Sequence, residues 1–583
     1  MVRVHPDPPF IFIFMTQLLS NNDATPPSRV FFVVVLSALI MIGWQIFFDK
    51  PAAKNKTEEK KIELAKAIIP EEIKIIPRSE SLLANINISD FSNEFVSGRI
   101  NKVGATIDSL VFNKYNYKID SDKSVFLLSP SDTKYARYVS FGWISDDVNA
   151  DLPTIKTIWK DNGGLVSDVD GKVLSWKNKD GIEFFISLIF DDKYMLTVKK
   201  YAINNSKKDL HLMPYTKIKR DVTDPSKDTS SYEGPVIVHE NSMKEVDYSK
   251  IKKSGGLDYI EDEKHCIEGQ HNWAGFSDKY WLSAILFDCN LVEKVSFRAY
   301  TNGNRKYIQS DVLENSMIVE SGKKSIETTS FVYLGAKDIS SLDDYSAKYS
   351  IKLFDKSIDF GMFYFLTKPI LLMLRFIHKF VDNYGLAIIF LTLVIRIALL
   401  PLGNKSYRMM GKMKSIQPKV DALKTQFGDD KMAMNKAMIE LYKKEKVNPF
   451  ATFIPILIQI PIFFALYKVL YISIEIRQSP FIWWIHDLSA PDPTTIFNLF
   501  GLLPFGVPGF LQVGVLPIIV GFTMWLQQIM SYSGPQNEYT KVMKYMPIFF
   551  TFLFASFPAG LMIYWSVNNL FSIANQYIVS GKK

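Results

Sequence analysis

The stretch Leu386-Ala-Ile-Ile-Phe-Leu-Thr-Leu-Val-Ile-Arg396-Ile-Ala-Leu-Leu-Pro401 places one arginine inside an otherwise uncharged apolar segment. A charged side chain at the centre of a membrane helix costs about 2.5–3.5 kcal/mol on insertion scales, so it normally marks a function. The other apolar segments contain no Asp or Glu that could pair with Arg396. We therefore expect a hydrated cavity around it. The alternative is snorkelling to a membrane surface, because Arg396 lies five residues before Pro401.

Five further apolar stretches approach or reach the 17–25 residues that a membrane span needs. Together with Gly385–Leu402 they predict six spans, and the remaining five are Val30–Phe48, Pro449–Ile472, Val513–Met530, Met543–Ser556 and Gly560–Val579. The chain of 583 residues is 48% apolar and still 22% charged, which indicates a soluble domain joined to a membrane domain. The predicted fold class is a polytopic α-helical membrane protein with a large exterior β-sandwich.

The segment boundaries follow from these spans and from changes in composition. Residues 1–29 form a cytoplasmic segment, 30–48 an uncleaved first anchor, 49–78 a flexible tether and 79–353 the exterior β-sandwich. Residues 360–380 form an amphipathic interfacial helix, because Lys368, Arg375 and Lys379 recur at helical spacing among apolar residues. The remaining spans are the second at 384–402, the third at 449–472, the fourth at 513–531, the fifth at 543–557 and the sixth at 559–579. The segments between and after them are a cytoplasmic hairpin at 403–448, an exterior loop at 473–512, a cytoplasmic loop at 532–542 and a cytoplasmic tail at 580–583.

Positive charge sets the orientation. Residues 404–447 carry eleven Lys or Arg against five Asp or Glu, whereas the loop 475–512 has only Arg477. By the positive-inside rule the former faces the cytoplasm, as do both termini, and residues 50–360 lie outside. This topology accounts for most of the net charge of +8, so no nucleic-acid partner is expected.

Residues 79–335 read as many short strands. Asp180-Gly181, between β-rich runs, is a strong hairpin signal, and Asn204-Asn205 marks the next turn. The only two cysteines, Cys266 and Cys289, are compatible with a disulfide outside the cell or with two buried thiols. Residues 1–14 resemble an over-extended start, with Met15 as the alternative first residue.

The predicted cytoplasmic hairpin is rich in methionine, a flexible side chain suited to varied apolar partners. The alternative is that these residues only pack its two arms together. They are Met409, Met410, Met413, Met432, Met434 and Met438.

Several kinds of chemistry are not indicated. We find no nucleotide-binding loop, no zinc-protease motif and no nucleophile elbow, so an enzyme, a cofactor and a metal are not expected. His265 and His271 near Cys266 fit no strong metal pattern. The polar residues inside spans are therefore the candidate groove, and helix-to-helix hydrogen bonding is the simpler explanation for the amides. The groove candidates are Arg396, Gln459, Gln527, Asn568 and Asn569.

Several motifs in order resemble one family. They are Lys443-Lys-Glu-Lys-Val-Asn-Pro-Phe450, Ile454-Pro-Ile-Leu-Ile-Gln-Ile-Pro-Ile-Phe-Phe-Ala-Leu-Tyr467, Arg477-Gln-Ser-Pro-Phe481, Trp484-Ile-His-Asp-Leu-Ser-Ala-Pro-Asp-Pro493, Met546-Pro-Ile-Phe-Phe-Thr551 and Phe557-Pro-Ala-Gly-Leu561. Together they resemble the YidC membrane protein insertases, relatives of the mitochondrial Oxa and chloroplast Albino insertases. The β-rich segment and the first anchor resemble the Gram-negative form.

The resemblance implies that five spans enclose a hydrophilic groove containing Arg396, beside an apolar slide for the incoming helix. It implies nascent membrane proteins and the Sec translocon as partners, membrane lipid as surroundings and the bacterial inner membrane as location. The ribosome is expected as a weak partner, because only Gly581-Lys-Lys583 follows the last span. The implied slide residues are Pro455, Ile460, Phe463, Leu553, Phe554, Tyr564 and Trp565.

Two alternatives from other classes remain. Arg396 would bind an anion in a small-molecule transporter, although such folds commonly show internal repeats and helices broken at the midplane. A chaperone scaffold with a membrane anchor would leave the motifs in the spans unexplained.

Overall fold

The computed structural model describes residues 75–119, 121–166, 171–224, 231–260, 266–428, 430–448, 454–501, 503, 507, 512–531 and 538–581. The predicted N-terminal segment, first span and start site, and most of the predicted tether, lie outside these residues. The described chain divides into two compact units. One is β-rich and contains residues 75–367 with Tyr471–Gln478; the other is helical and contains Lys368–Leu470 with Ser479–Lys583.

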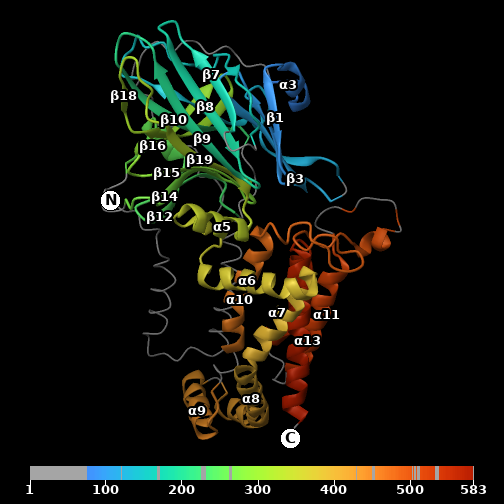
Figure 1. Ribbon diagram of the computed structural model, residues 1–583. Coiled ribbons are helices and arrows are strands. Elements are labelled where there is room, and N and C mark those ends of the chain that lie inside the picture. Colours follow the sequence, from blue (N-terminus) through green and yellow to red (C-terminus); the bar gives the residue numbers. More distant parts are fainter. Residues whose placement is uncertain are drawn as a thin grey trace. The chain divides into compact units, whose positions relative to one another are not determined.

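The β-rich unit consists of two antiparallel sheets (Figure 1). The first has the strand order β1-β2-β3-β5-β10-β17-β16-β13, with β4 beside β3 and β18 beside β10. Its strands are β1 Ile88–Ser92, β2 Val96–Asn101, β3 Thr106–Asn116, β4 Ser124–Leu128, β5 Arg137–Ile144, β10 Leu210–Asp221, β13 Leu257–Tyr259, β16 Val292–Asn302, β17 Arg305–Glu314 and β18 Met317–Val319.

The second sheet has the order β12-β11-β14-β15-β19-β9-β8-β7-β6. Its strands are β6 Lys160–Asp161, β7 Lys172–Lys177, β8 Ile182–Phe190, β9 Met195–Asn204, β11 Gly234–His239, β12 Ser242–Glu245, β14 His271–Ser277, β15 Trp281–Asp288 and β19 Thr328–Ala336. The predicted hairpin at Asp180-Gly181 is confirmed: β7 and β8 pair antiparallel up to Lys177 opposite Glu183.

Alternating burial along the strands builds the core between the sheets. On β9, Val198, Lys200 and Ala202 are buried while their neighbours are half-buried. Lys200 ties the two sheets together, because its Nζ lies 2.5 Å from Glu314 Oε1 on β17. Pairing of this kind offsets the cost of burying the two charges.

A second buried charge cluster lies at the end of β14. Asp278 accepts from Arg137 at 2.6 Å and pairs with Arg220 at 2.7 Å. Burial alone would raise the pKa of the Asp278 carboxyl, but the charges of Arg137 and Arg220 outweigh it and hold the pKa at about 2. The carboxylate therefore stays ionised at any physiological pH.

Cys266 and Cys289 form a disulfide, with their Cα atoms 5.7 Å apart. Of the two states that the sequence left open, the structure has the bonded one. The two cysteines are 23 positions apart in the sequence, and the bond between them closes a loop that contains β14 and β15. Closing a loop of this size restricts the unfolded chain and stabilises the fold by about 3 kcal/mol.

Short helices complete the β-rich unit: α3 Arg78–Ala84, α4 Tyr248–Ser254, α5 Ile339–Tyr349 and the 3-10 helix η2 Phe354–Ser357. Asp338 caps α5 by accepting from Ser340 and Ser341 amides. The segment Tyr471–Gln478 is held in this unit by Arg477, which donates to the Asn116 carbonyl at 2.6 Å.

The helical unit begins within α6, Tyr364–Val381, which is followed by α7, Tyr384–Ala398. The two helices meet at 120°. Its other helices are α8 Leu400–Phe427, α9 Lys431–Lys444, α10 Ile454–Ile472, α11 Val515–Ser531, α12 Glu538–Phe554, α13 Ala559–Gly581 and the 3-10 segment η4 Ile496–Gly501. Within the described residues, no helix by itself is both long and apolar enough to cross a membrane, and only the bent pair α6 and α7 reaches that limit jointly. Six spans therefore stay a prediction.

Candidate functional site

Arg396 is the starting point of a hydrogen-bonded chain through three helices. It lies half-buried in the last turn of α7, and its guanidinium donates to Gln459 Oε1 on α10 at 2.7 Å. The Gln459 amide donates in turn to the Tyr564 hydroxyl on α13. No carboxylate of the described chain forms an ion pair with Arg396. A neutral amide thus positions the guanidinium and leaves its charge uncompensated.

A buried polar ridge continues from Tyr564 along α13. The ridge residues follow one another at four-residue steps, so they lie on one face of the helix. Each of them is at most 7% exposed. They are Tyr564, Asn568, Ser572 and Gln576. The Oδ1 atom of Asn568 has no hydrogen-bond partner among the described residues, so it can accept from water or from a polar guest.

Asn569 extends the polar contacts to another helix. Its amide donates to Thr523 Oγ1 on α11 at 3.0 Å, and both residues are buried. Gln527 lies one turn further along the same face of α11 and is half-buried. All five residues predicted for the groove are therefore in the helical unit. Arg396 and Gln459 are in contact, whereas the described residues show no hydrogen bond from Gln527 to either of them.

The predicted slide residues also converge, around one indole. The ring centroids of Phe463 on α10 and Phe554 on α12 each lie 4.9 Å from that of Trp565 on α13. Tyr564, adjacent in sequence, points its hydroxyl to Gln459. An apolar aromatic cluster and the polar chain from Arg396 therefore occupy neighbouring positions on α13. The remaining slide candidates, Pro455, Ile460 and Leu553, are half-buried.

The predicted hairpin is formed by α8 and α9. Lys419 on α8 and Glu445 after α9 join its arms at 2.6 Å, and Asp430 caps α9 by accepting from the Ala433 amide. Met432, at the start of α9, is 77% exposed, whereas the other predicted methionines are half-buried: Met409, Met410, Met413, Met434 and Met438. Both interpretations of these methionines are thus compatible with the arrangement.

Sequence reasoning missed Thr523, Ser572 and Gln576. Threonine and serine in an apolar helix are not conspicuous, because their hydroxyls can bond to the backbone of the same helix. Ser572 does so, donating to the Asn568 carbonyl at 2.8 Å. The recurring step of four residues after Tyr564 was the signal that would have found the ridge.

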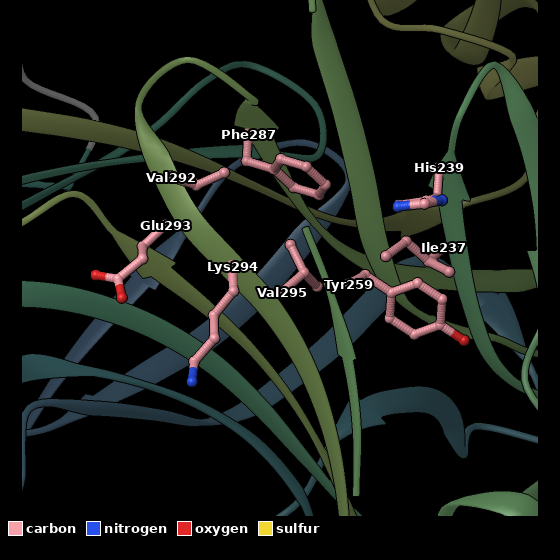
Figure 2. Close-up of a pocket in the computed structure, with 8 residues that line it drawn as sticks. All are labelled: Ile237, His239, Tyr259, Phe287, Val292, Glu293, Lys294 and Val295. Atoms are coloured by element: carbon pink, nitrogen blue, oxygen red, sulfur yellow. The ribbon is translucent and has the colours of Figure 1, made fainter. Parts of the chain in front are cut away.

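The described part of the β-rich unit contains no comparable site. Figure 2 shows its small pocket between β11, β13 and β16, with the rings of His239 and Tyr259 on one side and Glu293 and Lys294 extending away. Its volume of about 10 Å³ holds at most a single water molecule. Lys244 donates to His239 Nδ1 at 3.0 Å, which leaves Nε2 to donate to the Ile260 carbonyl. Among the described residues, no three His, Cys, Asp or Glu side chains gather to hold a metal ion.

Comparison with known proteins covers both units. Residues 89–373 match the family model described as the YidC periplasmic domain, and residues 376–583 match that of the 60Kd inner membrane protein. A membrane protein insertase YidC of Rickettsia rickettsii (strain Iowa) is 40% identical over 94% of this chain and 98% of its own. That of Rickettsia akari (strain Hartford) is 39% identical, with the same coverage.

The chain belongs to the YidC insertase family. It therefore has the coarse organisation of the family, with a periplasmic β-rich domain and a helical C-terminal region of the inner membrane. The solved crystal structure of an active YidC insertase with its first transmembrane domain resolved is 15% identical, over 94% of this chain and 99% of that one, with a TM-score of 0.36.

Proposed function

We propose that the chain inserts hydrophobic segments of nascent membrane proteins into the inner membrane, alone or together with the Sec translocon. The single observation that carries the mechanism is the uncompensated charge of Arg396, held by Gln459 beside the aromatic cluster of Phe463, Phe554 and Trp565. The family membership supports the insertase activity, and the chemistry of these residues supports the route.

The physical task is to move a polar flank across the membrane while the hydrophobic segment enters lipid. The Arg396 guanidinium attracts an acidic flank, and the polar ridge, with the buried and unbonded Asn568 Oδ1, offers that flank polar contacts part-way through the membrane. This shortens the apolar distance that the flank has to cross. No bond is made or broken, so the activity needs neither nucleophile nor cofactor.

The hydrophobic segment takes a parallel route over apolar side chains. The half-buried rings of Phe463 and Trp565, together with the buried Phe554 ring that packs against Trp565, form an uncharged cluster of α10, α12 and α13. Transfer of the segment into lipid is driven by burial of its apolar surface, at about 25 cal/mol per Å². The attraction of the flank to Arg396 is needed only transiently, so a lone guanidinium suits it better than a permanent ion pair.

The proposed topology has both termini and the α8–α9 hairpin in the cytoplasm. The excess of basic residues between 404 and 447 supports this orientation. In that position the hairpin meets the segment first as it leaves the ribosome or the translocon. The exposed Met432 and the half-buried methionines of its two arms suit varied apolar sequences.

Arg396→Ala tests the proposal with two substrates that differ only in the charge of the translocated flank. Insertion of the acidic-flank substrate should slow strongly, and that of the neutral-flank substrate much less. Arg396→Lys should retain most activity, because a point charge suffices where no bidentate partner is engaged. Undiminished insertion of both substrates by Arg396→Ala would exclude the role in flank attraction. An equal loss of both would instead assign Arg396 to holding the helices together.

A further inference from the structure

A crevice between α11 and α12 is lined by residues other than those assigned to the groove and the slide. The two helices touch where Gly521 faces Thr551, since a Cβ atom at Gly521 would collide with the Thr551 hydroxyl. That hydroxyl is turned toward its own helix and donates to the Pro547 carbonyl at 2.9 Å. Glycine at this position therefore allows the closest approach of the pair, and the crevice extends from there.

The crevice has a volume of about 320 Å³ and an almost entirely apolar lining. Ile518, Phe522 and Trp525 line it from α11, and Tyr545 and Ile548 line it from α12. The one charged residue of the lining is Lys544, at the end of the crevice away from the Gly521–Thr551 contact. Tyr and Trp beside a lysine are the residues that membrane proteins place at the level of lipid headgroups.

The walls of the crevice are exposed although they are apolar. Phe522 is 59% exposed and Ile548 is 58% exposed. In a helical region of the inner membrane, exposed apolar side chains of this kind face hydrocarbon. A volume of about 320 Å³ is too small for a further helix, which measures about 10 Å across. An unbranched hydrocarbon chain is the component of the membrane that fits, and a phosphate at its head would meet Lys544.

We infer that the α11–α12 crevice binds one acyl chain of an anionic phospholipid whose phosphate pairs with Lys544. The lysine supplies a point charge, which is suited to phosphate. The apolar walls of the crevice contact the bound acyl chain in place of the disordered lipid around it. The inference rests on the proposed topology, in which Lys544 lies at the cytoplasmic surface, where anionic headgroups attract basic residues by about 1 kcal/mol each. Because α12 also carries the slide residue Phe554, the bound lipid supports the helix that guides the substrate.

The test uses the full chain in phosphatidylcholine nanodiscs with a trace of phospholipid that carries a photoreactive group in its acyl chain. The probe has either a phosphatidylglycerol or a phosphatidylcholine headgroup, and mass spectrometry maps the labelled residues. Adducts of the phosphatidylglycerol probe should concentrate on Phe522, Trp525 and Ile548. They should exceed adducts on the exposed α7 residues Phe390 and Val394 severalfold.

Two variants separate the headgroup from the chain. Lys544→Gln should lower labelling by phosphatidylglycerol about fivefold, to the level of phosphatidylcholine, as loss of about 1 kcal/mol implies. Ile548→Trp fills the crevice and should abolish the enrichment for both probes. Lys412→Gln, on the exposed surface of α8, is the matched control and should change neither. Equal labelling of the crevice and of α7, or equal labelling by both headgroups in the parent chain, would overturn the inference.

Discussion

At the residue scale, the partner of Arg396 is the informative detail. A carboxylate in place of Gln459 would neutralise the guanidinium, whereas the amide fixes its position and leaves the charge available. Transfer of a charged guanidinium from water into the protein costs free energy. A chain selected only for stability would have paired Arg396 with a carboxylate or replaced it by an apolar residue. The arrangement thus favours function over stability at this point.

Gln459→Glu tests this view with an isosteric change. The new carboxylate should pair with Arg396, so insertion of acidic-flank substrates should fall about as far as with Arg396→Ala. Neutral-flank substrates should be affected much less, because the helices keep their hydrogen bond. The measurement is insertion of the matched substrate pair, with Gln527→Glu as a control that adds the same charge elsewhere in the unit. Unchanged insertion of acidic flanks by Gln459→Glu would contradict the role of an open charge.

A second residue-scale prediction concerns Asp278. Its pKa of about 2 lies below the ordinary value of 3.8, so its carboxylate stabilises the β-rich unit above about pH 4. That contribution, about 2 kcal/mol, is lost as the pH falls through 2. Asp278→Asn removes the carboxylate that pairs with both the buried Arg137 and the half-buried Arg220, and it should cost about 3–5 kcal/mol near neutral pH.

Thermal unfolding followed by the β-strand circular dichroism signal measures both effects. The difference between the parent chain and Asp278→Asn should shrink from pH 7 toward about pH 2. Asp258→Asn removes an exposed partner of Arg298 and should cost less than about 1 kcal/mol. A difference that stays constant with pH would show that Asp278 acts through packing rather than charge.

At the element scale, local sequence signals predicted some features well and others not at all. Asp180-Gly181 specifies its hairpin through turn chemistry alone, and Asp338 and Asp430 cap the helices that follow them. The bond between Cys266 and Cys289 and the contact of Arg396 with Gln459 depend on tertiary packing, which no local pattern encodes. The strand order of the two sheets was unpredictable for the same reason, since β10 pairs with β5 and β17 from distant parts of the chain.

The α8–α9 hairpin can be tested as an element. Replacing residues 421–436 by a short flexible linker removes the tip but keeps the Lys419–Glu445 pair that joins the arms. If the hairpin receives substrate, insertion should fall severalfold while the protein still accumulates in the membrane. The readouts are insertion rate and membrane yield, with unfolding of the β-rich unit as the control for correct folding. Full activity after the deletion would reduce the hairpin to a connector.

At the scale of the whole molecule, the chain has the insertase function of the YidC family to which it belongs. The β-rich periplasmic domain and the helical region were both predictable from composition and periodicity, because strand and span patterns differ strongly. The polar residues that join α7, α10 and α13 could be named from the sequence, because polar side chains inside apolar helices are conspicuous. Their hydrogen bonds to one another could not be predicted.

The most direct measurement is insertion into lipid vesicles that contain the purified full chain. A single-span substrate with a short acidic flank is synthesised in their presence, and protection of the flank from added protease reports insertion. We expect a protected flank with the parent chain, much less protection with Arg396→Ala, and only background protection with protein-free vesicles. Protection no greater than in protein-free vesicles, with and without added Sec translocon, would contradict the proposed insertase activity.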